Sequence, residues 1–339
     1  MANFNCFDNF IGTSRAICNP VVPESSLYLE DLAGITLVDA AKLSDSEKLT
    51  GKKVMEDVIS FAQKLVNEDY KNIIRPYVRQ TQILENAIAG YYPIPTTASA
   101  SEAKYKGVLI RVDDSRNVGI YINTVSLWTD SAQSIDILIF DARNGVQLDV
   151  IPITTIGGEI TTISVNKFYL TEGQNTAIFV AWDEIDNTIL TPVFGTGGAG
   201  CGSCLKNGQL HFPYVTVKAA EVSNASVPSY SNLRFTGYTG GLSVKFNLEC
   251  SMENYLCSIR NILKLHYLYK AGSEFMLERI HSTRLNNYTF VTIDKAKELR
   301  EFYEKKYIEL MMQTAQTARP PDDVCFYCRE GLKQTVSIP

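Results

Sequence analysis

The sequence has few histidines and tryptophans, and no apolar run is long enough to cross a bilayer. Only 3 of its 339 residues are His and only 2 are Trp. Lys and Arg total 32 against 37 Asp and Glu, a formal net charge of −5, so nothing in the charge suggests a nucleic-acid partner. The 45% of hydrophobic residues are enough to bury two or three modest cores.

The first residues, Met1 to Cys6, lack the basic residues and the long apolar core of a secretory signal peptide. We therefore expect the protein to be made and kept in the cytosol. Thiols stay reduced in that compartment, so a disulfide framework is the less expected use of the cysteines.

Six of the eight cysteines lie in close pairs: Cys201 with Cys204, Cys250 with Cys257, and Cys325 with Cys328. Two C-x-x-C turns can direct four thiolates at one tetrahedral ion. We therefore predict a structural zinc site formed by Cys201, Cys204, Cys325 and Cys328, assembled by tertiary folding because the two turns are far apart. Cys250 and Cys257 are alternative ligands, since residues seven apart share a helix face. Unligated thiols are the competing interpretation.

The first hundred residues predict an arm followed by helix. Residues 1–43 mix aromatics and prolines without a sustained period, which suits an extended arm lying on another surface. Residues 44–90 carry apolar residues at helical spacing and predict a helical segment. Pro76 should split this segment, and Gly90 should end its second piece. Residues 91–104 are expected to form a linker.

Residues 105–192 predict an antiparallel β-sandwich. Six short β-branched segments follow one another here: 107–112, 118–127, 135–140, 147–153, 159–165 and 177–182. Their connections are too short for crossover helices, so the strands should pair antiparallel. Residues 193–249 are rich in glycine and cysteine and predict an irregular β extension of the sandwich.

The C-terminal part returns to helical spacing. Residues 250–318 predict a helical hairpin, and Pro320 with Pro321 should end it before a cysteine-containing tail at 319–339. The predicted fold class is α+β: an antiparallel β-sandwich inserted between an N-terminal long helix and a C-terminal helical hairpin.

The known catalytic motifs are largely absent from the sequence. Residues 195–200 match the string G-x-G-x-x-G, but no βαβ pattern surrounds them, so they predict a flexible loop. The three histidines, His211, His266 and His281, are scattered and predict packing or surface roles. We find no acid and base pair and no nucleophile system, and expect no enzyme activity.

Short segments along nearly the whole chain carry a family resemblance: residues 6–12, 26–35, 152–155, 250–257, 272–280, 286–289 and 325–328. In these segments the chain resembles an uncharacterised family of virion structural proteins found in bacteriophages and prophages of Bacteroidota. That family has no assigned activity. The resemblance therefore implies a virion component of the neck or tail, and transfers no catalytic residue.

The expected function is that of a non-enzymatic virion protein assembled in the host cytoplasm. Its expected partners are copies of itself and other virion proteins, without nucleic acid or a membrane span. Residues 1–43 would clasp a neighbouring subunit and become ordered on assembly. The alternative is a carbohydrate-binding or adhesin module, in which Trp128 or Trp182 on the sandwich recognises a host surface glycan.

Overall fold

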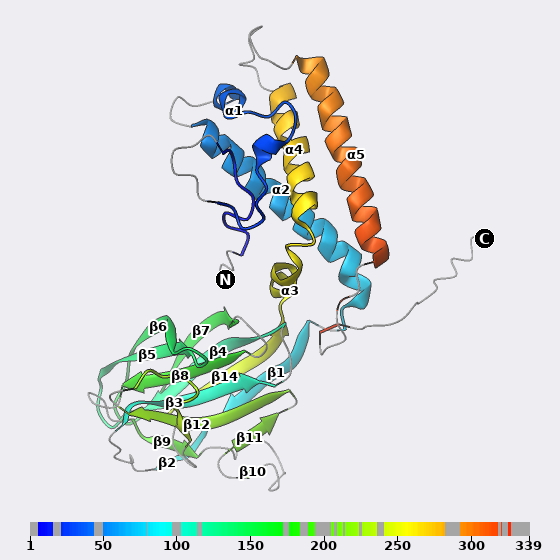
Figure 1. The fold of residues 1–339 in the computed structure, drawn as a ribbon. Coiled ribbons are helices and arrows are strands. Elements are labelled where there is room, and N and C mark those ends of the chain that lie inside the picture. The colour runs from blue at the N-terminus through cyan, green and yellow to red at the C-terminus, as the bar shows by residue number, and fades with distance from the viewer. Residues whose placement is uncertain are drawn as a thin grey trace, which may run out of the picture. The chain divides into compact units, whose positions relative to one another are not determined.

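The computed structural model divides the chain into two compact units, each described here by itself (Figure 1). The first, the β unit, is formed mainly by Arg79–Ser251 with Asp323–Cys325. The second, the helical unit, is formed by Asn3–Val78, Met252–Asp322 and Phe326–Pro339. The structure describes residues 6–15, 22–43, 50–79, 81–96, 103–113, 117–171, 176–183, 189–193, 205–206, 209–212, 214–223, 226–235, 241–281, 292–317, 320 and 325–326.

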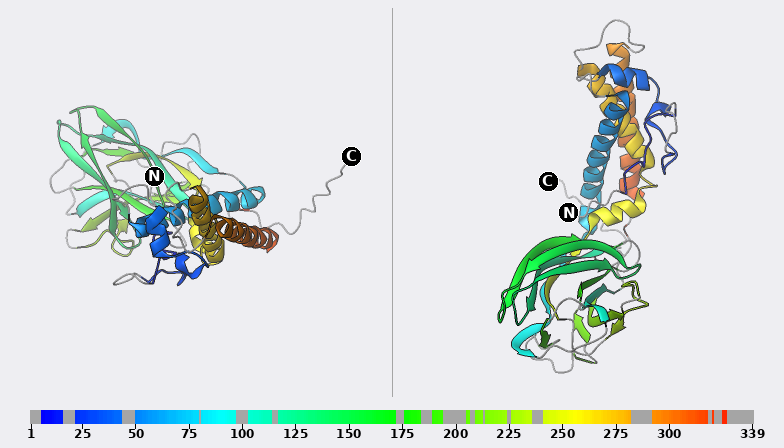
Figure 2. Two further views of the ribbon diagram at one scale, coloured as in Figure 1. Left: turned by 90° about the horizontal axis from the view of Figure 1, so that it is seen from above. Right: turned by 90° about the vertical axis from the view of Figure 1, so that its left-hand side faces the viewer.

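The helical unit contains five α-helices over the described residues: α1 (Leu37–Leu43), α2 (Gly51–Ile74), α3 (Met252–Ile259), α4 (Lys264–His281) and α5 (Ile293–Thr317). Helix α2 begins at Thr50, whose hydroxyl accepts a hydrogen bond from the Lys53 amide. Helix α4 packs against both α2 and α5 (Figure 2). Helices α4 and α5 run antiparallel, because His266 meets Thr314 near one end of the pair and Lys270 meets Glu304 further along.

The structure has a long N-terminal helix, α2, and two antiparallel C-terminal helices, α4 and α5, and it corrects two expectations. The predicted hairpin at 250–318 also contains α3, which precedes α4 as a separate helix. The predicted second helical piece before Gly90 is wrong, because Gln82–Ala89 form a strand, β1. Pro76 lies in a 3-10 turn at Arg75–Tyr77, and the chain after it pairs with a strand more than 150 residues away. That pairing overrides a weak helical period.

The described parts of residues 1–43 are not an extended arm. Phe10, Leu29 and Ile35 are buried in the helical unit of the same chain, and the Tyr303 hydroxyl of α5 donates to the Ala33 carbonyl at 2.6 Å. An irregular segment can bury apolar side chains one at a time, so the missing sequence period did not indicate exposure. The expected clasp on a neighbouring subunit would require these residues to leave their own core.

A buried ion pair joins α1 to α4. Arg279 Nη1 lies 3.4 Å from Asp39 Oδ1, and both side chains are 1% exposed. The Thr36 hydroxyl donates to the other oxygen of Asp39 at 2.8 Å. Desolvating two charges is costly, and the attraction between the two side chains offsets part of that cost.

Over the described residues, the β unit contains a four-stranded sheet, an eight-stranded sheet and a two-stranded pair of β2 with β9. The strand order is β1-β14-β4-β7 in the first sheet and β10-β11-β12-β3-β8-β5-β6 in the second, where β13 also pairs with β12. All pairings between named strands are antiparallel. The remaining bounds are β2 Tyr91–Thr96, β3 Ala103–Val112, β4 Val118–Trp128, β5 Ser134–Asp141, β6 Val146–Thr154, β7 Ile160–Tyr169, β8 Ala177–Asp183, β9 Thr191–Val193, β10 Leu205–Lys206, β11 Gln209–Phe212, β12 Val215–Ser223, β13 Arg234–Phe235 and β14 Ser243–Cys250.

The α+β class and the antiparallel sheets are confirmed, and the six strands expected within 105–192 are β3 to β8. The predicted linker at 91–104 instead contains β2 and the start of β3. Residues 193–249 are more than an extension, because β12 pairs with β3 and β14 pairs with β4 within the two large sheets. Of the predicted tail at 319–339, the structure describes residues 320, 325 and 326.

Asp149 links the edge strands of the two large sheets. It lies on β6 and accepts hydrogen bonds from Lys167 Nζ at 2.6 Å and the Tyr169 hydroxyl at 2.9 Å, both on β7. Partial burial would raise the pKa of Asp149, but the bonds from Lys167, Tyr169 and the Val150 amide outweigh burial and lower the pKa. The carboxylate therefore stays charged where the sheet edges meet.

Among the described helices, none combines the length and the apolar composition needed to cross a membrane.

The substitution Asp39→Asn should lower the free energy of unfolding by about 3–5 kcal/mol, because it removes the carboxylate charge that faces the buried Arg279 guanidinium. Urea unfolding of the full chain measures this. The double variant Asp39→Leu/Arg279→Met should recover most of the loss. The surface variant Asp57→Asn, which breaks only an exposed i,i+4 pair, is the matched control and should leave the midpoint unchanged. A wild-type midpoint for Asp39→Asn would refute the role of the pair.

Candidate functional site

Four of the eight cysteines form two disulfides. Cys6 pairs with Cys257 in the helical unit, and Cys250 pairs with Cys325 in the β unit, with Cα–Cα distances of 5.9 and 5.7 Å. The partners are 251 and 75 residues apart in sequence, so spacing along the chain could not show the pairing. The sequence analysis ranked disulfides below thiols and zinc because it assumed a reducing compartment.

The predicted zinc ligands are not brought together in the described part of the chain. Cys325 is bonded to Cys250, and Cys257 is bonded to Cys6, so the predicted ligands Cys250, Cys257 and Cys325 offer no thiolate while the disulfides are closed. Cys201, Cys204 and Cys328 lie outside the described residues. Over the residues that the structure does describe, no group of three His, Cys, Asp or Glu side chains could hold a metal. The zinc site stays a prediction for the reduced protein.

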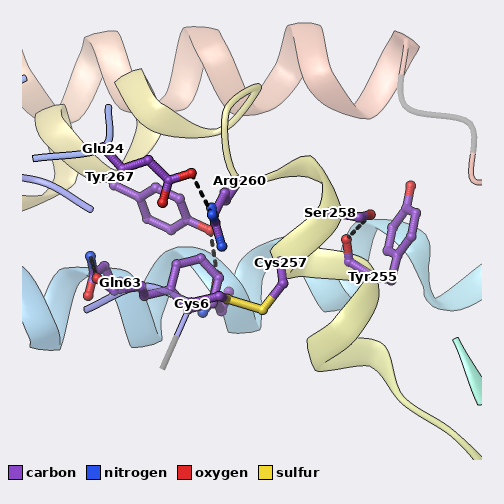
Figure 3. Close-up of a disulfide and its surroundings, with 10 residues drawn as sticks. Cys6, Glu24, Gln63, Tyr255, Cys257, Ser258, Arg260 and Tyr267 are labelled. Carbon is purple, nitrogen blue, oxygen red and sulfur yellow. Dashed lines mark hydrogen bonds and ion pairs between the residues drawn. A yellow bond between two sulfur atoms is a disulfide. The ribbon is translucent and has the colours of Figure 1, made fainter. Parts of the chain in front are cut away.

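The Cys6–Cys257 disulfide belongs to a set of contacts that we call the N-terminal latch (Figure 3). The latch comprises Cys6–Cys257, the ion pair of Glu24 with Arg260, and a hydrogen bond of 3.3 Å from Gln63 Nε2 to the backbone carbonyl of Phe7. These contacts hold residues 6–15 and 22–25 against α2 and the α3–α4 connection. The latch thus combines one covalent bond with two polar contacts.

Tyr267 of α4 packs under the latch. Its ring meets Phe7 and Phe10 edge-on, with centroid distances of 5.5 and 6.0 Å. Its hydroxyl donates to Asn67 Oδ1 of α2 at 2.7 Å, and burial raises the pKa of Tyr267 well above its usual value. Tyr267 is therefore a neutral packing residue, not an acid or base for chemistry near neutral pH.

A cleft of about 470 Å³ lies beside the latch. Side chains between residues 7 and 14 form one wall, and α2 forms the other. On α2 the charges pair within the helix, Lys52 with Glu56 at 3.6 Å and Lys53 with Asp57 at 2.8 Å. The cleft lining contains neither His nor Cys. Sequence reasoning missed the cleft because residues about 45 positions apart form its walls and neither segment carries a motif.

The histidines and tryptophans occupy structural positions where they are described. His266 is buried between α4 and α5, and its Nε2 lies 2.8 Å from the Thr314 hydroxyl. His281 is exposed at the end of α4, and His211 lies in β11. Trp182 is buried and Trp128 is half-buried. Burial of Trp182 removes one of the two rings proposed for a glycan platform.

A scan against protein-family models finds no match to this chain, and a search of the curated proteins finds none. The resemblance to virion structural proteins therefore stays a prediction from the sequence. Function has to be argued from the residues and contacts of the chain itself.

If zinc binds the reduced protein through the two C-x-x-C turns, native mass spectrometry under reducing conditions should show one zinc ion per chain. Cys204→Ser and Cys328→Ser should each lower the metal content and the melting temperature together. Cys18→Ser, at a cysteine outside the predicted ligand set, is the control and should keep the wild-type metal content. A metal-free reduced wild type would exclude the zinc site.

Burial lowers the pKa of His266 below its usual value of about 6.5. The unfolded chain then takes up this proton at a higher pH than the folded chain. The contribution of neutral His266 to the free energy of unfolding should be fully present above the pKa that this histidine has in the unfolded chain. It should decline as the pH falls below that pKa. The variant His266→Gln should therefore lose less melting temperature than wild type between about pH 7.5 and pH 5.

The exposed His281→Gln is the matched control for this comparison, and should follow the wild-type pH dependence. Equal pH dependence of wild type and His266→Gln would contradict the assignment.

Proposed function

We propose that this protein is a non-enzymatic structural component of a bacteriophage particle, a neck or tail protein that assembles through contacts between subunits. Its partners are copies of itself and other virion proteins, and assembly takes place in the host cytoplasm. We also infer that the two large sheets pack as a β-sandwich, inserted in the chain between the N-terminal long helix and the C-terminal helical pair. The link from Asp149 to β7 supports this packing.

The observation that carries the proposal is an apolar stripe on α5. One face of this helix packs on α4 through Tyr303, Tyr307 and Met311. On another face Ile308 is 44% exposed and Met312 is 62% exposed, flanked by Glu301, Lys305 and Glu309. Exposed apolar side chains bordered by charges are typical of surfaces that bind another protein.

A second exposed apolar surface lies on β6. Val146, Leu148 and Val150 alternate along this strand, and all three are exposed. Strand β6 lies at the edge of its sheet, where a further strand could pair with it. Two of its residues offer no free backbone amide for such pairing: Pro152 has no N–H, and the Val150 amide donates to the Asp149 side chain. Both features discourage pairing with a further strand, so the face of β6 rather than its edge is the available contact surface.

The disulfides are compatible with a protein that leaves the cytoplasm inside a particle. Disulfides persist on virion surfaces and in other oxidising environments, but are rare in the cytosol. We infer that the chain folds and assembles with reduced thiols, and that the disulfides close after the particle is released. Covalent closure then stabilises subunits that can no longer be replaced.

The double variant Ile308→Ser/Met312→Ser should weaken self-association at least about tenfold, because it removes the apolar stripe without touching the α4–α5 core. Sedimentation velocity over a range of concentrations measures the change. Phe61→Ser, at an exposed position on α2, is the matched control and should associate as wild type.

If the wild-type protein is monomeric at every concentration, the proposal that it self-associates through the α5 surface is wrong. Mass spectrometry of phage particles purified from the host that encodes the chain tests the location separately. Particles without the chain would refute the virion assignment.

A further inference from the structure

The cleft of about 470 Å³ between residues 7–14 and α2 has two fixed walls. The α2 wall belongs to a helix of 24 residues. The opposite wall is held by backbone hydrogen bonds to the chain that follows it: the Gly12 amide donates to the Leu27 carbonyl at 2.9 Å, and the Leu29 amide donates to the Gly12 carbonyl at 2.8 Å. The side chain of Phe10 anchors the same wall, since it is 0% exposed. A cleft of this size with walls fixed in advance is typical of small-molecule sites.

Several polar groups that line the cleft have no partner among the described residues. Thr13 is 8% exposed, and its hydroxyl makes no hydrogen bond within the part of the chain that the structure describes. The same is true of the side chains of Asn9 and Ser60. Gln63 uses its Nε2 to hold the Phe7 carbonyl, and its Oε1 has no described partner. A buried hydroxyl without a partner costs stability, so these groups point to a ligand that supplies the missing hydrogen bonds.

The charges of the lining favour a neutral ligand. Its two cations pair within α2, Lys52 with Glu56 at 3.6 Å and Lys53 with Asp57 at 2.8 Å. Asp8 adds a third carboxylate, so an anion would meet more negative than positive charge. Over the described residues, no group of three His, Cys, Asp or Glu side chains could hold a metal ion. The ligand is therefore one that carries no charge and both donates and accepts hydrogen bonds.

Apolar side chains complete the lining of the cleft. Phe7, Ile11 and Ile59 lie among the polar groups of the two walls. A sugar ring combines an apolar face of C–H groups with an edge of hydroxyls, and each hydroxyl can donate and accept a hydrogen bond. A wholly apolar molecule would leave the polar groups of the cleft unpaired. The mixed lining thus matches a neutral sugar.

We propose that this cleft binds a neutral saccharide, with Asn9, Thr13, Ser60 and Gln63 as its hydrogen-bonding residues. The site belongs to the helical unit, whereas Trp128 and Trp182, the rings considered above for a glycan, belong to the β unit. The inference does not depend on the proposed function in a particle.

The test measures binding of glucose, galactose, mannose, N-acetylglucosamine and lactose to the full-length protein, with glucuronate and inorganic phosphate as charged comparators. Ligand-observed NMR titrations give an apparent Kd for each. At least one neutral sugar should bind with an apparent Kd of about 1 mM or tighter, and more tightly than either anion. Absence of binding by every neutral sugar, or binding no tighter than that of the anions, would overturn the proposal.

Two variants remove polar groups of the cleft without removing a contact of the fold. Thr13→Val replaces the hydroxyl by a methyl group of similar size. Asn9→Gly removes the amide at a residue whose φ is 54°, a conformation that glycine adopts freely. Each variant should weaken sugar binding at least about threefold, and the double variant about tenfold. The melting temperature should stay at the wild-type value or rise, whereas a lower melting temperature for Thr13→Val would overturn the assignment of its hydroxyl to the ligand.

Asn166→Gly is the matched control for Asn9→Gly. Asn166 of β7 is exposed and has a φ of 50°, but it lies in the β unit, so the variant should bind sugar as wild type. If a variant at Asn9 or Thr13 fails to fold, Ser60→Ala replaces it, because alanine is favoured within a helix such as α2. Ser60→Ala should also weaken binding at least about threefold. Wild-type affinity of the cleft variants, or equal weakening by Asn166→Gly, would place the sugar elsewhere and overturn the proposal.

Discussion

The buried pair of Asp39 and Arg279 is the contact on which the helical unit most depends. It joins α1 to α4 through two charges that are both removed from water, so losing either charge takes away a favourable interaction of the other in a buried site. The amides of Leu29 and Glu30 donate to the carbonyls of Gly12 and Thr13, so the segment beside α2 is hydrogen-bonded to the chain that leads into α1. The cleft lies between this segment and α2. An irregular segment thus becomes one wall of a cavity.

The β unit is stabilised differently, by extensive strand pairing and by alternation of apolar residues between the faces of its sheets. Strand β8 is buried along nearly its whole length, because β3 and β5 flank it and both of its faces are covered. The strand β6 has an exposed apolar face. Together with the stripe on α5, this face is the exposed apolar surface on which the proposed role in a particle rests.

Local patterns predicted the elements well where one face of an element is buried and the other is wet. Strands β3 to β7 and helices α2 and α5 follow from such patterns. Prediction failed at β1, where pairing with β14 decides the structure, and in residues 1–43, whose burial follows no regular period. The prediction from sequence also missed the candidate site, because nothing in the sequence indicates that Cys6 and Cys257 form a disulfide.

The sequence by itself determined the α+β class and the antiparallel pairing of the strands, because residue spacing and short connections depend only on neighbours along the chain. Only the tertiary structure decided the disulfide partners, the charge pair of Asp39 with Arg279, and the cleft beside α2. Each of these joins segments tens to hundreds of residues apart. Their energies come from burial and proximity in space, which no local pattern records.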